Sequence, residues 1–236
     1  MIVPLLHVRQ TFAIKLLFSY YVDLCYHIFH NTQVEILFFL IILIFSIIIH
    51  EVAHGYVAEM LGDSTARLAG RLTLNPVPHI DPLGSVLVPA MLLFSTAGQF
   101  AFGWAKPVPY NPYNLRNFKW GTFAVSIAGV AVNLLIAIVF GLLLRFHAEF
   151  GIDSSAFLQI IATIVQLNLI LAVFNMIPVP PLDGAKVLFT LLPQRFQYIH
   201  DFMEQNWIIF IIPVLFLAHY IIWPITSFLF NVIVGI

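Results

Sequence analysis

The sequence predicts an all-α polytopic membrane protein with about five to six membrane segments, a small membrane-associated β-hairpin and one re-entrant or interrupted segment. Of its 236 residues, 61% are hydrophobic and only 9% are charged, so polar side chains are too few to cover a water-soluble globule. The apolar runs are continuous rather than alternating, which favours helices over a barrel, because a helix in hydrocarbon satisfies its own backbone hydrogen bonds. A bundle of membrane helices is therefore expected.

The first 33 residues form an N-terminal extension ahead of a core domain that covers residues 34–236. Within this extension, residues 11–30 are long enough to cross a membrane, but Lys15 and Asp23 interrupt the apolar run. A spanning helix and an amphipathic helix at the membrane interface both remain open. Cys25 is the only cysteine and cannot form an internal disulfide, so a buried apolar role is expected for it.

The first strong span covers residues 34–58, and a Leu-Gly-Asp sequence ends it at residues 61–63. Apolar and polar residues then roughly alternate over residues 66–75, which predicts a short strand or hairpin. Residues 84–104 are apolar again, but a proline and two glycines interrupt them. This stretch is the candidate for the re-entrant or interrupted segment.

Three further spans are expected later in the chain, at residues 122–144, 157–174 and 207–230. In the first of these, Gly129 and Asn133 lie one helical turn apart, a small and a polar residue that together suit close contact between helices. The second span runs into residues 175–184, where three prolines break the helix at membrane depth. Unwound backbone is tolerated there only inside protein or beside water.

A His-Glu-x-x-His sequence lies near the C-terminal end of the first span, at His50, Glu51 and His54. Residues four apart on a helix differ by about 40° around its axis, so both imidazoles can reach one ion. Glu51 is displaced by about 100°, which puts its carboxylate beside the metal, where it can accept a proton from an activated water. Zinc suits two nitrogens plus a carboxylate, and one Zn²⁺ per chain is therefore expected.

Chance is the alternative explanation of this motif, since a chain of this composition would contain it in on the order of one case in a hundred. The membrane setting argues against chance. An ionisable residue at the centre of a bilayer costs roughly 2.5 to 3.5 kcal/mol on insertion scales, so it marks a functional site by default.

Asp183 is the best candidate for a third ligand, because it follows the proline-broken backbone and has Gly184 beside it. Its alternative role is that of a turn residue in Pro-Leu-Asp-Gly. If Asp183 shares a metal with the two histidines, the spans that precede them must run parallel, which requires an odd number of crossings between them. Residues 122–144 supply one crossing, so residues 84–104 are expected not to cross fully.

The basic residues support the same arrangement of spans. This arrangement of spans places Arg145 alone on one side of the membrane. The other basic residues beyond position 34 lie on the opposite side: Arg67, Arg71, Lys106, Arg116, Lys119, Lys186 and Arg195. The positive-inside rule makes the crowded side cytoplasmic, so the site is expected to open toward the cytoplasm. The formal net charge of −1 gives no field that would attract nucleic acid.

Two separated motifs, His50-Glu51-Val52-Ala53-His54 and Asn175-x-x-Pro178-x-Pro180-Pro181-Leu182-Asp183-Gly184, resemble the site-2 protease family of intramembrane zinc metallopeptidases. The stretches at residues 70–76, 79–84 and 103–107 are similar to those of compact bacterial and archaeal members, which lack PDZ and CBS domains. The resemblance implies that His50, His54 and Asp183 bind zinc, that Glu51 is the catalytic base, and that Asn175 lies at the site.

The same resemblance implies an endopeptidase that cleaves transmembrane protein substrates within the lipid bilayer, as in regulated intramembrane proteolysis. Asn175 is the first candidate for a neutral donor to the tetrahedral oxygen, and His79 is a weaker second, since a loop-packing role is commoner for such a histidine. The strand expected at residues 66–75 would offer an edge to an extended substrate.

Two other functions use the same residues. One is a catalytically silent module that binds membrane proteins, against which the intact Glu51 argues. The other is a metal transporter, in which a base that is not a ligand has no purpose.

Overall fold

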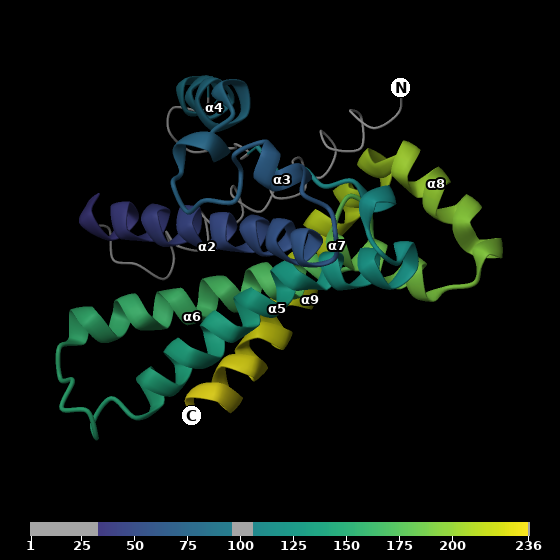
Figure 1. Ribbon diagram of the computed structural model, residues 1–236. Coiled ribbons are helices and arrows are strands. Elements are labelled where there is room, and N and C mark those ends of the chain that lie inside the picture. Colours follow the sequence, from purple (N-terminus) through teal and green to yellow (C-terminus); the bar gives the residue numbers. More distant parts are fainter. Residues whose placement is uncertain (1–32, 96–105, 236) are drawn as a thin grey trace.

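The computed structural model describes residues 33–95 and 106–235 (Figure 1). Three helices in these ranges are long and apolar enough to cross a membrane: α2 (Gln33–Met60), α5 (Phe118–Arg145) and α6 (Ser155–Asn175). At about 1.5 Å per residue, even the shortest of them matches a hydrocarbon core of about 30 Å. The expected spans at residues 34–58, 122–144 and 157–174 are thus found as helices.

The three long helices alternate in direction, as a shared metal requires. Figure 1 shows α2 and α6 running the same way and α5 running the opposite way, and α5 packs against both of the others. The C-terminal ends of α2 and α6 consequently lie at the same end of the bundle as the N-terminal end of α5. The residues that the sequence singles out as metal ligands lie at this end.

Beyond α6 the chain turns through residues 176–182, which include the cis peptide between Pro180 and Pro181, into α7 (Asp183–Leu191). Helix α8 (Gln197–Gln205) follows, and α9 (Trp207–Val234) then packs against α5 and α6. Helix α9 contains two prolines and covers the residues of the expected last span, but its apolar stretch in the described residues, Tyr220–Val234, is shorter than a membrane crossing requires. This last span and the expected five to six membrane segments therefore stay predictions. Residues 11–30, the other candidate span, lie outside the described residues.

The β-hairpin expected at residues 66–75 is not found, and the described residues contain no β-strand. The chain forms one helical turn, α3 (Thr65–Leu68), and then irregular backbone. The buried Arg71 explains this, because its guanidinium donates to three main-chain carbonyls, at Pro78, Lys106 and Pro107. One side chain thereby supplies the cross-links that a strand ladder would supply.

The described part of the interrupted segment is short. A π-helical stretch, Pro82–Leu87, leads into α4 (Val88–Ser95), and together they extend about 21 Å, less than the hydrocarbon thickness. Residues 96–105 lie outside the described residues, so the re-entrant path of the whole segment stays a prediction.

The core that fixes these helices joins α2, α6 and α9. Leu43, Phe174 and Ile222 are among its buried members. A polar contact adds to the apolar packing, since the buried Asn168 of α6 donates to the hydroxyl of Ser46 on α2 at 3.0 Å. Such contacts between small and polar residues suit helices packed in a membrane.

Candidate metal centre

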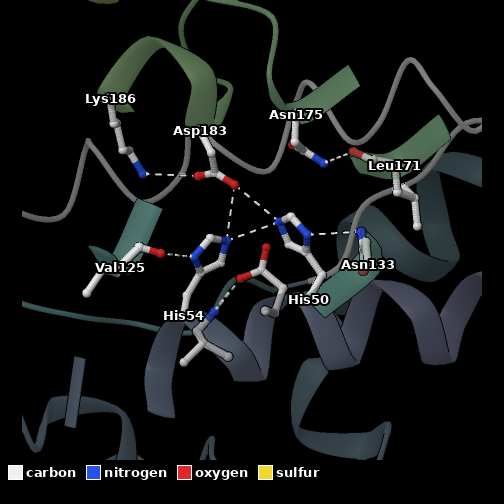
Figure 2. Close-up of polar contacts among 10 residues, drawn as sticks. His50, His54, Val125, Asn133, Leu171, Asn175, Asp183 and Lys186 are labelled. Carbon is white, nitrogen blue, oxygen red and sulfur yellow. Dashed lines mark hydrogen bonds and ion pairs between the residues drawn. The ribbon is translucent and has the colours of Figure 1, made fainter. Parts of the chain in front are cut away.

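Three side chains from two separate helices converge at the end of the bundle where α2 and α6 finish. His50 and His54 of α2 face Asp183, the first residue of α7, and all three are buried (Figure 2). Oδ2 of Asp183 lies 3.2 Å from Nε2 of His50 and 3.1 Å from Nε2 of His54. The two Nε2 atoms are 3.0 Å apart, so the three atoms form a nearly equilateral triangle.

This triangle fits a zinc ion. Ligand atoms bound to a tetrahedral zinc at about 2.0 to 2.1 Å are separated by about 3.3 Å, close to the three separations found here. Two imidazole nitrogens and one carboxylate form a ligand set of catalytic zinc sites, which keep the fourth position open. Another group, His200, Asp201 and Glu204 on α8, is partly exposed and lies on one short helix.

The second ring nitrogen of each histidine also has a neighbour. Nδ1 of His54 donates to the main-chain carbonyl of Val125 at 2.6 Å. A carbonyl only accepts, so this contact places the proton on Nδ1 and leaves the lone pair of Nε2 directed at the triangle. Nδ1 of His50 lies 3.2 Å from the side-chain nitrogen of Asn133.

Helix α5 approaches these rings closely because residue 129 is a glycine. A Cβ atom at Gly129 would lie 2.5 Å from Nε2 of His50 and 2.6 Å from Nε2 of His54, too close for any side chain. Val125, Gly129 and Asn133 are spaced by four residues and therefore share one face of α5. On this face, Val125 supplies a carbonyl that accepts from His54, Gly129 leaves space for both rings, and Asn133 places its amide beside His50.

Glu51 lies next to the triangle without joining it. Its Oε2 accepts a hydrogen bond of 3.0 Å from the backbone N–H of Val108, in the segment that precedes α5. Glu51, the three candidate ligands and Val108 line one cavity of about 20 Å³, large enough for an occupant the size of a water molecule. The carboxylate of Glu51 is thus oriented by a backbone N–H that lies outside helix α2.

Lys186 and Tyr110 form another part of the cavity wall. Nζ of Lys186 lies 3.8 Å from Oδ1 of Asp183, the carboxylate oxygen that faces away from the histidines. The same ammonium lies 5.6 Å from the centre of the Tyr110 ring, within the range of a cation–π contact. The two oxygens of Asp183 therefore have different partners.

The two donor candidates differ in position. Asn175 lines the cavity, and its side-chain nitrogen donates to the carbonyl of Leu171 at 2.8 Å, which leaves its second amide hydrogen available. His79 lies in the loop before α4, where Nε2 donates to the carbonyl of Thr73 at 2.9 Å. Burial lowers the pKa of His79. The structure brings Asn175 to the site and gives His79 a contact within its own loop.

Several site residues were not predicted from the sequence, namely Val108, Tyr110, Val125 and Lys186. Val108 and Val125 act through their backbone N–H and carbonyl groups, which nearly every residue type has, so the sequence gives no signal of their role. The one available signal was Lys186, a cation three residues after Asp183 and so on the same face of a helix.

Comparison with known proteins places these residues in a family. The model of peptidase family M50 matches residues 38–219, a range that contains all three candidate ligands. YwhC of Bacillus subtilis (strain 168), named a candidate zinc metalloprotease, is 39% identical over 200 residues, covering 80% of this chain and 86% of its own. No solved structure matches the chain.

More distant relatives come from other prokaryotes. Rip2 of Mycolicibacterium smegmatis, also named a candidate zinc metalloprotease, is 32% identical over 150 residues, covering 59% of this chain and 51% of its own. MJ0392 of the archaeon Methanocaldococcus jannaschii, named a zinc metalloprotease, is 27% identical over 159 residues, covering 67% and 35%. The resemblance seen in the two sequence motifs is confirmed, and the chain belongs to peptidase family M50, the site-2 protease family.

Proposed function

We propose that this protein is an intramembrane zinc endopeptidase that hydrolyses peptide bonds of transmembrane proteins, with Glu51 as general base. Membership of family M50 makes it a zinc metalloprotease that acts on peptides or proteins, and three apolar helices make it an integral membrane protein. The observation that carries the proposal is the triangle of His50, His54 and Asp183 with the carboxylate of Glu51 beside it.

The bound zinc would supply a water of lowered pKa and polarise the scissile carbonyl. His50, His54 and Asp183 would hold the ion and leave one position open. Glu51, oriented by the N–H of Val108, would take the proton of the attacking water through its second oxygen and pass it to the leaving amine. The free amide hydrogen of Asn175 would donate to the developing oxyanion.

Burial of the site supports transmembrane substrates. The candidate ligands are at most 8% exposed and lie among three helices of membrane length, which supports a scissile bond that reaches them within the bilayer. A substrate helix hides its carbonyls in its own hydrogen bonds and must unwind locally before cleavage.

The arrangement in the membrane extends the proposal. Residues 34–236 would form the peptidase core, with α9 as a fourth span, and residues 1–33 the N-terminal extension. Relatives in bacteria and an archaeon support a prokaryotic plasma membrane. The end of the bundle that holds the site carries Arg67, Lys119 and Lys186, whereas Arg145 ends α5 at the other end, which supports a cytoplasmic site.

Replacing Glu51 by glutamine tests the mechanism. An amide cannot take the proton, so Glu51→Gln should abolish cleavage of a model transmembrane substrate by the purified protein while one zinc per chain stays bound. Glu59→Gln is the matched control, two turns along α2, where the carboxylate pairs with Arg67 away from the site.

The possible outcomes separate the proposed mechanism from the two alternative functions. Cleavage by Glu51→Gln would refute the assigned mechanism, and loss of its zinc would make Glu51 a ligand. A silent binding module would show no cleavage with or without the substitution. A transporter would move zinc across vesicles equally well with glutamine at this position.

A further inference from the structure

Asn133 is the most deeply buried polar residue that touches the candidate ligands. It lies on α5 with 0% of its surface exposed, and its side-chain nitrogen is 3.2 Å from Nδ1 of His50. Its Oδ1 atom is buried and makes no hydrogen bond within the described part of the chain. A buried acceptor without a donor is rare in folded proteins and calls for an explanation.

The chemistry of imidazole shows what this contact must be when a metal is bound. A neutral histidine carries one N–H and one lone pair, and a metal takes the lone pair. If Nε2 of His50 is a ligand, Nδ1 therefore bears the hydrogen and requires an acceptor. An amide nitrogen cannot accept, but the oxygen of the same amide can.

Half a turn of the Asn133 side chain exchanges its nitrogen and oxygen. With the oxygen toward His50, Nδ1 gains an acceptor and Oδ1 gains the donor that it lacks. The nitrogen then needs an acceptor, and the carbonyl one turn back along the helix is the acceptor that Asn168 and Asn175 both use on α6, at 2.9 and 2.8 Å.

We propose that Asn133 is a positioning residue whose Oδ1 accepts the Nδ1–H of His50, fixing the tautomer and ring orientation that present Nε2 to zinc. The inference rests on the proposed zinc site. It makes the two histidines equivalent, because the carbonyl of Val125 already accepts the Nδ1–H of His54. One face of α5 would thus orient both nitrogen ligands, as partners in the outer shell of metal sites do.

Zinc affinity is the readout that separates this role from simple packing. We would measure it by chelator competition on the purified protein, with no substrate present. Asn133→Leu keeps the size of the side chain and removes the acceptor, so zinc affinity should fall about 10- to 100-fold. Asn168→Leu is the matched control, because it removes an equally buried amide from α6 and should leave zinc affinity unchanged.

Asn133→Asp decides the direction of the hydrogen bond. A carboxylate accepts and cannot donate, so this variant should keep the affinity of the unsubstituted protein if Oδ1 faces His50. If the amide nitrogen instead donated to Nδ1, aspartate would lose that bond, and zinc affinity would fall as it does in Asn133→Leu. The visible spectrum of the cobalt-substituted protein should match the unsubstituted one for aspartate and differ for leucine.

Four results would be decisive against the proposal or its basis. Unchanged zinc affinity in Asn133→Leu, or equal losses in the leucine and aspartate variants, would overturn the role of Asn133. If Asn133→Leu does not fold, the affinity of Asn133→Asp decides alone: retention supports the role and loss overturns it. Absence of zinc binding by the unsubstituted protein would instead refute the metal centre itself, and the role of Asn133 with it.

Discussion

Gly129 is the residue of helix α5 at which any side chain would collide with both candidate nitrogen ligands. Its missing side chain leaves room beside Nε2 of both His50 and His54, the atoms that would bind the ion. Val125 and Asn133 reach the outer sides of the same rings only because α5 lies so close. A single position therefore sets the separation between two helices and the geometry of the ligands.

Gly129→Ala should abolish zinc binding and proteolysis. The added methyl group would overlap both Nε2 atoms, and the rings or the whole of α5 would have to move. Zinc content of the purified variant, measured by elemental analysis, checks this expectation. Gly121→Ala is the control on the same helix, because the three atoms nearest to its methyl group all belong to the side chain of Leu115, at 3.0 Å or more. Full zinc content in Gly129→Ala would contradict this account.

The ligand triangle could be predicted from residue types, but its surroundings could not. Histidines four apart on an apolar span favour a metal site by their chemistry, whereas Asp183 was the best candidate for a third ligand with a turn role still open, and the family resemblance joined it to the histidines. The contact of His54 with Val125 involves a main-chain carbonyl, which every residue has. The contact of His50 with Asn133 depends on how closely two helices approach, a distance that one-dimensional spacing does not contain.

At the scale of elements, the turn after α2 is tied to the segment before α5 by one carboxylate. Asp63 is fully buried, and its carboxylate accepts hydrogen bonds from the hydroxyl of Thr65 at 2.5 Å and from the backbone of Thr65 and Asn111 at 3.2 and 2.6 Å. The side chain of Asn114 donates a further hydrogen bond at 2.9 Å. Burial alone would raise the pKa of Asp63, but these hydrogen bonds outweigh it and hold the pKa below its usual value.

Asp63→Asn should destabilise the protein at neutral pH by about 1 to 3 kcal/mol, because an amide accepts fewer of these hydrogen bonds. The pKa of Asp63 is lower in the folded state, so its contribution is complete above the ordinary pKa of aspartate and is lost as pH falls through the folded value. Thermal unfolding in detergent, followed from neutral to acidic pH, should show a smaller acid-dependent loss in the variant. Parallel pH profiles would refute this assignment. Asp201→Asn, on the exposed face of α8, is the control.

The same region shows where reading elements from sequence fails. Residues 66–75 alternate as a strand does, yet so short a pattern also fits a helical turn with Ala66 facing inward. Tertiary contacts of Asp63 and Arg71 decide between them, and both depend on segments more than thirty residues away. The long spans were predictable because length and apolarity leave a membrane segment no alternative to helix.

At the scale of the whole molecule, the direction of the bundle in the membrane can be measured. In a Cys25→Ser background, cysteines introduced at Tyr113 and Tyr198 should react with a membrane-impermeant reagent only from the cytoplasmic side. A cysteine at Phe150, in the loop between α5 and α6, should react only from the opposite side. All three positions are well exposed, at 79%, 70% and 65%. Labelling of positions 113 and 198 from opposite sides would contradict the topology.

The alternation of α2, α5 and α6 has a consequence for how the molecule is held together. The loop between α5 and α6 lies at the end of the bundle remote from α7 (Figure 1). A break in that loop would leave both histidines and their orienting groups on one fragment and Asp183 on the other. All three ligands would then reach the ion only when the two fragments associate, so binding of the metal would stabilise the association of the two parts of the chain.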